Sequence, residues 1–253
     1  MHPHSFLWHY LWIAPYALQI VIAVVMVRRG LHREFPVFFI YTVFEPLQGA
    51  VLFILDHIES VKAIQYQYAY WPTLVLNAGL RFALLYEISA HVFHNYPAIE
   101  ELARILYRWL AGFLILIAVG ISAYTRTSDS HWFLTGSHVL NQGVDLVQIG
   151  LLLFIFVFSI YFKLSWRNYV YGIALGLGLY SSVDLATSAI RAAIGPQPAN
   201  YAFDFITMVT YHCCVVFWLV YMLAPEFSRR VVKNLPADNL KEWNSELERL
   251  LLR

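Results

Sequence analysis

Apolar residues form seven long stretches along the chain, separated by short segments that contain proline, glycine and charged residues. About 20 apolar residues in an α-helix are needed to cross the hydrocarbon layer of a membrane, and each stretch reaches roughly that length. The pattern therefore predicts an all-α integral membrane protein, in which residues 1–225 form a seven-transmembrane-helix bundle. The predicted spans are 6–27, 36–56, 72–93, 106–124, 138–162, 169–193 and 203–223.

Residues 226–253 are too polar to cross a membrane, and we assign them to a cytoplasmic tail. Within 238–253, Leu240, Trp243, Leu247 and Leu250 recur on one helical face, opposite charged and amide side chains. This spacing predicts an amphipathic helix that lies on the membrane surface or docks on a partner protein. A tail helix that only adds solubility is the alternative.

Lysine and arginine residues gather on one side of the predicted bundle. The loops after the first, third and fifth spans, the first residues of the fourth span and the start of the tail contain ten of them, against two on the opposite side. Cytoplasmic loops carry this excess, so the N-terminus is predicted outside and the C-terminus in the cytoplasm, which in a bacterium means the inner membrane. The ten residues are Arg28, Arg29, Arg33, Arg104, Arg108, Lys163, Arg167, Arg229, Arg230 and Lys233, and the two are Lys62 and Arg126.

Composition narrows the classes of partner. The chain is 60% hydrophobic and 13% charged, with a net charge of +1, which fits a lipid bilayer environment and gives no reason to expect nucleic acid. The seven spans and their loops use most of the 253 residues, so no soluble catalytic domain is expected. A protein partner would bind through the tail helix or through the third loop, 94–107.

Ionisable residues occur deep inside the predicted spans. Glu45, Arg81, Asp184 and His212 each lie about nine residues from a span end, which is ~14 Å at the helical rise. Asp145 lies nearer the outer face, at ~10 Å by the same rise. A charge at such depth costs at least ~3 kcal/mol, so these residues are expected to face a site or a hydrated cavity.

Polar residues also share one face on each of five spans, which is what a common polar interior requires. Hydrogen bonding between helices, worth ~0.6–2 kcal/mol per bond, is the competing explanation for the amides and for His212. Arg81 is expected to pair with Asp145 or Asp184, and the excess of core acids favours proton, cation or amine handling. The candidate ligand-binding residues are Glu45, Asn77, Arg81, Asn141, Asp145, Asp184, Tyr211 and His212.

Seven spans with an external N-terminus resemble G-protein-coupled receptors and microbial rhodopsins in topology alone. A retinal protein needs a lysine in the seventh span, and 203–223 contains none, so no retinal is expected. Seven-span zinc hydrolases carry His-x-x-x-His in the last span, whereas here His212 is followed by Cys213 and Cys214. We therefore assign no metal ligand, catalytic residue or cofactor. Gly172 and Gly176 form a small-residue pair typical of close helix packing.

Three functions follow from these features. The first is an outward-facing polar cavity that binds or conducts a small polar or cationic ligand, or protons, as in a receptor or transporter. The second is a structural or accessory subunit of a larger inner-membrane complex. The third is a membrane-embedded hydrolase with a carboxylate or His212 as general base, which the residues favour least because no nucleophile or metal motif accompanies it.

Overall fold

The computed structural model describes residues 6–58, 63–94, 130–161, 168–194 and 200–224, with a few isolated positions between 101 and 112; for 130–141 only the backbone is described. These residues are helical throughout their long segments and include no strand, so the all-α prediction is confirmed for them. The helices are α1 (Phe6–Arg29), the short 3-10 helix η1 (Leu31–Arg33), α2 (Pro36–His57), α3 (Ala63–Phe93), α5 (Ser130–Tyr161), α6 (Asn168–Ile194) and α7 (Asn200–Leu223).

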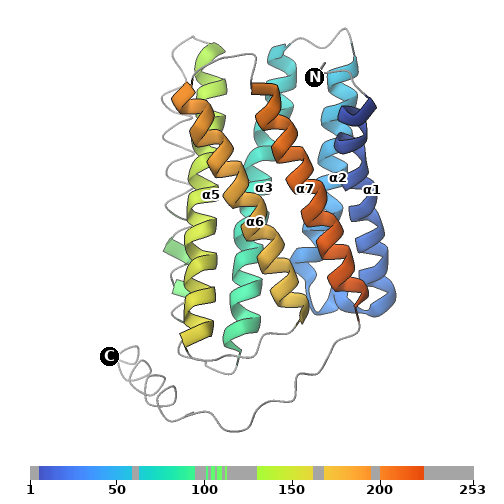
Figure 1. Ribbon diagram of the computed structural model, residues 1–253, viewed down its shortest axis with the longest axis vertical. Helices are drawn as coiled ribbons and strands as arrows, with labels where there is room; N and C mark the ends of the chain where they lie inside the picture. The colour runs from blue at the N-terminus through green and yellow to red at the C-terminus, as the bar shows by residue number, and fades with distance from the viewer. Residues whose placement is uncertain are drawn as a thin grey trace.

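The six α-helices of the described residues run side by side (Figure 1), and their mutual contacts close a ring. Going around it, α1 packs on α2, α2 on α3, α3 on α5, α5 on α6, α6 on α7, and α7 returns to α1. A further contact between α3 and α6 crosses the ring. Helices that are distant in sequence therefore share one interior, and side chains from α1, α3 and α6 can meet there.

Five of these helices contain a stretch that is long and apolar enough to cross a membrane: 6–29, 36–55, 142–160, 169–191 and 201–223. Their outward faces carry exposed aliphatic side chains such as Ile20, Val157 and Val220. Such faces are suited to lipid, and the fold indicates a multi-pass integral membrane protein. The helix α3 lies in the same ring but is less apolar, since it contains Arg81 and Glu87.

Two predicted segments lie outside the described residues: the tail 226–253 and, apart from isolated positions, the fourth span 106–124. One of those positions, Tyr107, is buried and donates a hydrogen bond to the carbonyl oxygen of Leu85 on α3 at 3.1 Å. Its ring also meets that of Tyr86 edge-on. Residue 107 thus packs against α3.

The helix α3 begins at Ala63, well before Pro72, where the third span was predicted to begin. Proline within a helix lacks the N–H that would bond the preceding turn. Here Thr73 donates from its hydroxyl to the carbonyl oxygens of Tyr70, at 2.7 Å, and Ala69, at 3.3 Å. The hydroxyl thus bonds carbonyl oxygens of the turn before the proline, and the helix continues through Pro72 to Phe93.

An apolar core fills the half of the bundle where α1 and α7 end. Trp218 is 1% exposed, and its ring meets Phe38 and Tyr41 of α2 edge-on. Alanine Cβ atoms at Gly172 and Gly176 would lie within 3 Å of Tyr221 and Trp218 on α7. The close packing predicted for this glycine pair is therefore confirmed, and it brings α6 and α7 together below the polar half of the bundle.

Charged side chains complete two helix ends in this same half. The carboxylate of Glu87, from α3, accepts hydrogen bonds from the N–H groups of Val37, at 2.9 Å, and Phe38, at 3.0 Å, at the start of α2. Arg29 donates to the carbonyl oxygens of Met222, Leu223 and Ala224 at the end of α7. Glu87 and Arg29 thus satisfy backbone groups that a helix end leaves free, and their charges suit the helix dipoles.

We expect Glu87→Gln to lower the free energy of unfolding by ~1 kcal/mol, because a single amide oxygen replaces two carboxylate oxygens and the charge at the α2 N-terminus is lost. Unfolding in detergent, followed by circular dichroism, measures the change. The control is Glu101→Gln, which removes a half-exposed ion pair with Arg104 and should cost less. Equal effects of the two substitutions would contradict a capping role for Glu87.

Candidate functional site

A cavity of about 660 Å³ lies inside the bundle between α1, α2, α3, α6 and α7. Its lining comes from the first parts of α1, α3 and α7, the middle of α2 and the later part of α6, so it occupies the end of the bundle that is uppermost in Figure 1. Along α3 the lining extends from Tyr66 to Arg81, a depth of ~22 Å at the helical rise. The cavity therefore reaches toward the middle of the bundle.

Glu45 of α2 lies in this lining and is surrounded by neutral hydrogen-bond donors. Asn77 Nδ2 donates to Glu45 Oε1 at 2.6 Å, and the hydroxyl groups of Tyr41 and Tyr211 reach the same carboxyl group. Gln19 of α1 in turn donates to the Tyr211 hydroxyl at 2.7 Å. Side chains from four helices thus meet around one carboxyl group that is only 8% exposed.

Arg81 of α3 forms the second polar centre. Its Nη2 atom lies 2.6 Å from Asp145 Oδ1 of α5 and donates to Ser181 Oγ of α6 at 2.8 Å. Both charged side chains are almost fully buried, with 6% and 1% exposure. The predicted pairing of Arg81 is confirmed, and Asp145 is the partner. The guanidinium group also lies 5.7 Å from the centre of the Tyr180 ring, a cation–π arrangement.

The opening of the cavity is polar. Arg191 of α6 lies 2.6 Å from Asp204 of α7, and both side chains are partly exposed. Ser188 and Thr207 line the cavity next to them. An ion pair at the rim and polar groups beneath it allow a hydrated ligand to enter without first losing all of its water.

The structure brings five of the eight candidate residues into the cavity lining, namely Glu45, Asn77, Arg81, Asp184 and Tyr211. Asp145 lies behind the lining, as the partner of Arg81. His212 lies outside the lining and packs near Tyr10 of α1, with 5.6 Å between ring centres. The side chain of Asn141 lies outside the described residues.

Apart from Tyr211, the aromatic residues of the lining were not among the candidates. Tyr16, Tyr70 and Tyr180 all line the cavity, and Trp8 and Trp12 line it near the N-terminus. A usable signal existed in the spacing, because Tyr41 lies four residues before Glu45 and Tyr180 four before Asp184. Residues at this spacing share a helical face.

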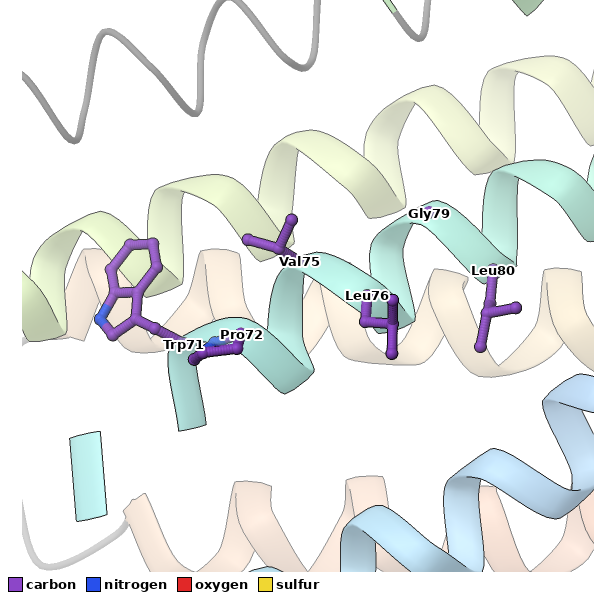
Figure 2. Close-up of a pocket in the computed structure, with 6 residues that line it drawn as sticks. All are labelled: Trp71, Pro72, Val75, Leu76, Gly79 and Leu80. Atoms are coloured by element: carbon purple, nitrogen blue, oxygen red, sulfur yellow. The ribbon is translucent and has the colours of Figure 1, made fainter. Parts of the chain in front are cut away.

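A second hollow, of about 510 Å³, lies on the surface of α3 (Figure 2). Its lining is apolar apart from the indole N–H of Trp71, and it includes Val75, Leu76 and Leu80. Gly79 leaves no side chain between Leu76 and Leu80. This hollow has the chemistry of a lipid- or helix-facing surface and offers no charged group to a polar ligand.

Among the described residues, no group of three or more histidine, cysteine, aspartate or glutamate side chains could hold a metal ion. The described cysteines, Cys213 and Cys214, are both free thiols, one exposed and one buried. The side chains that line the cavity supply carboxyl, guanidinium, amide, hydroxyl and phenol groups.

Comparison with protein-family models, curated protein sequences and solved structures finds no match to this chain. Its function is therefore inferred from the geometry of the cavity.

Proposed function

We propose that this chain is a seven-span membrane protein with an external N-terminus and a cytoplasmic C-terminus, and that its cavity binds or conducts a small polar ligand from the outer side. The observation that carries this proposal is the cavity of about 660 Å³ with Glu45, Asn77 and Arg81 in its lining. Its volume falls within the ~300–1,000 Å³ that is common for small-molecule sites.

The orientation of the cavity follows from the charges in the loops. The lining lies where α1, α3 and α7 begin, and the excess of lysine and arginine lies at the opposite helix ends. By the positive-inside rule, the cavity then faces the outside. This placement suits a receptor or a transporter that takes up its ligand from the external medium.

Rigid support around the polar groups agrees with a binding role. Arg81 is fixed by Asp145 and Ser181, and Gln148 also donates to the Ser181 hydroxyl. These bonds join α3, α5 and α6 directly behind the cavity. Polar groups held in this way are oriented before a ligand arrives, which lowers the entropy lost on binding.

We expect a cysteine at Ser188 to react with a membrane-impermeant thiol reagent added outside cells, in a background where Cys213 and Cys214 are replaced by serine and alanine. Ser188 lines the cavity, and a thiol reacts as its thiolate, which forms in water. Labelled protein is detected by mass shift. Ser182→Cys is the control on the same helix, since Ser182 is exposed on the bundle surface but is not part of the lining.

The same assay tests the orientation. Ser165→Cys, in the predicted cytoplasmic loop and outside the described residues, should react only after permeabilisation. Labelling of Ser165→Cys in intact cells together with protection of Ser188→Cys would reverse the orientation. Equal labelling of Ser188→Cys and Ser182→Cys would show that Ser188 is no more accessible to water than the outer surface of the bundle, and would contradict a hydrated cavity.

A further inference from the structure

We infer that the ligand of this cavity carries a protonated primary amine, and that the ammonium group binds between Glu45, Asn77 and Gln48. This inference rests on the proposed function and narrows it to one chemical class. It requires three features: acceptors for the N–H groups, a negative charge to balance the ammonium, and walls that fit the remainder of the molecule.

The acceptors lie on α2 and α3. Asn77 donates its Nδ2 to Glu45, and its Oδ1 is buried without a hydrogen-bond partner among the described residues. Gln48 lies one turn beyond Glu45 on α2, and its Oε1 is also buried without a hydrogen-bond partner among the described residues. All three side chains line the same cavity. A primary ammonium group carries three N–H donors and no acceptor, as in the lysine side chain, and so matches three oxygen acceptors.

The charge around the cavity is negative when its ionisable side chains are counted in their usual forms. Glu45, Asp184 and Asp204 line it together with Arg81 and Arg191, and Asp145 lies directly behind Arg81. Two guanidinium groups thus stand against four carboxyl groups. Both arginines are within 2.6 Å of an aspartate, whereas Glu45 makes no ion pair with a described residue. A bound cation would offset the cost of burying the Glu45 carboxylate.

The walls are largely aromatic. Tyr41, Tyr70, Tyr180 and Tyr211 line the cavity, and the rings of Tyr180 and Tyr211 are 5.1 Å apart. Aromatic faces attract cations, and their apolar surface fits an apolar body attached to the amine. A small amphiphilic amine therefore fits the site better than an inorganic cation, which has no apolar part to bury.

The test uses four probes with the same phenylethyl body: 2-phenylethylamine, its N,N,N-trimethyl derivative, 2-phenylethanol and phenylacetate. Binding to the full chain in lipid nanodiscs is measured by isothermal titration calorimetry. We expect the primary amine to bind most tightly, because the trimethyl compound keeps the charge but has no N–H to donate. Glu45→Gln should weaken binding of the amine at least ~10-fold, since it removes the negative charge that attracts the ammonium group.

Glu87→Gln is the matched control, because Glu87 is also a buried acid but caps α2 and does not line the cavity. It should leave the affinity for the amine unchanged. If Glu45→Gln does not fold, Asn77→Ala and Gln48→Ala replace it. Each should reduce the preference for the primary over the trimethylated amine.

Four results would overturn the inference. Tighter binding of the trimethyl derivative would leave no role for the amide acceptors, and binding that is insensitive to Glu45 would place the amine elsewhere, for example in the lipid. Tighter binding of 2-phenylethanol or phenylacetate would reject the ammonium while leaving the cavity as a ligand site. If none of the four probes binds, the amine inference fails, while external labelling of Ser188→Cys still decides separately whether the cavity is hydrated.

Discussion

Arg81→Met is expected to destabilise the protein by ~3–5 kcal/mol, because it leaves the buried Asp145 carboxylate without its partner. Asp145 is 1% exposed, so water cannot take the place of the guanidinium group. The hydrogen bond from Arg81 to Ser181 is lost as well, which affects α6. The loss is measured as the shift in the denaturation midpoint of the purified protein in detergent.

A second substitution identifies the partner. Asp145→Asn in the Arg81→Met background removes the stranded charge and should recover a large part of the loss, because residues in contact have non-additive effects. Asp184→Asn should recover less, since Asp184 is not the residue bonded to Arg81 at 2.6 Å. Simple addition of the single losses in the Arg81→Met/Asp145→Asn protein would refute a direct pair.

The double variant also distinguishes a role of the Arg81–Asp145 pair in fold stability from a role of Arg81 in ligand binding. If the pair only supports the fold, the Arg81→Met/Asp145→Asn protein should regain both stability and amine binding. If the guanidinium group contacts the ligand, stability should return while affinity stays low. Calorimetry on the same preparation gives both readings, and the first result is expected because a guanidinium group repels the ammonium group of the inferred ligand.

Gly176→Ala is expected to destabilise the bundle by ~1–3 kcal/mol through overpacking. An alanine Cβ would lie 2.9 Å from two atoms of the Trp218 ring and closer still to its Nε1. Trp218 is 1% exposed and donates to the carbonyl oxygen of Ile173 at 3.3 Å, so it has no free space to move into. The expected result is a lower denaturation midpoint with cavity labelling at Ser188→Cys preserved in the folded fraction.

Gly150→Ala is the control for this substitution. Gly150 is exposed on α5, and no atom lies within 4 Å of the position of its added Cβ. Alanine is favoured over glycine in a helix by ~1 kcal/mol, so Gly150→Ala should be neutral or stabilising. If Gly150→Ala and Gly176→Ala lowered stability equally, the effect would be one of glycine replacement in general, and the close contact between α6 and α7 would not be its cause.

The hydrophobic pattern alone predicted the helical membrane architecture, because the length of an apolar helix is set by the thickness of the bilayer. It also predicted which ionisable residues lie deep in the bundle: depth follows from counting residues along a helix. Glu45, Arg81 and Asp184 were predicted at similar depth, and the structure places all three in the lining of one cavity. Local spacing was similarly sufficient for the packing role of Gly172 and Gly176.

Only the tertiary structure decided what each buried charge does, because its partners come from other helices. Counting residues could not distinguish Asp145 from Asp184 as the partner of Arg81, since this depends on how α3, α5 and α6 are rotated against one another. Glu87 lies inside the third predicted span, but its carboxylate caps α2, a backbone contact that no side-chain pattern encodes. His212 has a suitable depth but lies at the edge of its helical face, and packing directs it toward Tyr10.

The aromatic walls were also decided by tertiary structure. Tyrosine near a span end is compatible both with the membrane interface and with a cavity, and sequence spacing alone does not separate the two. Tyr70 and Tyr180 line the cavity because α3 and α6 contact each other across the ring and present these rings inward. The sequence by itself thus determined depth and helical face, which are properties of single helices. The choice of partner belongs to the packed bundle, since side chains from separate helices meet only there.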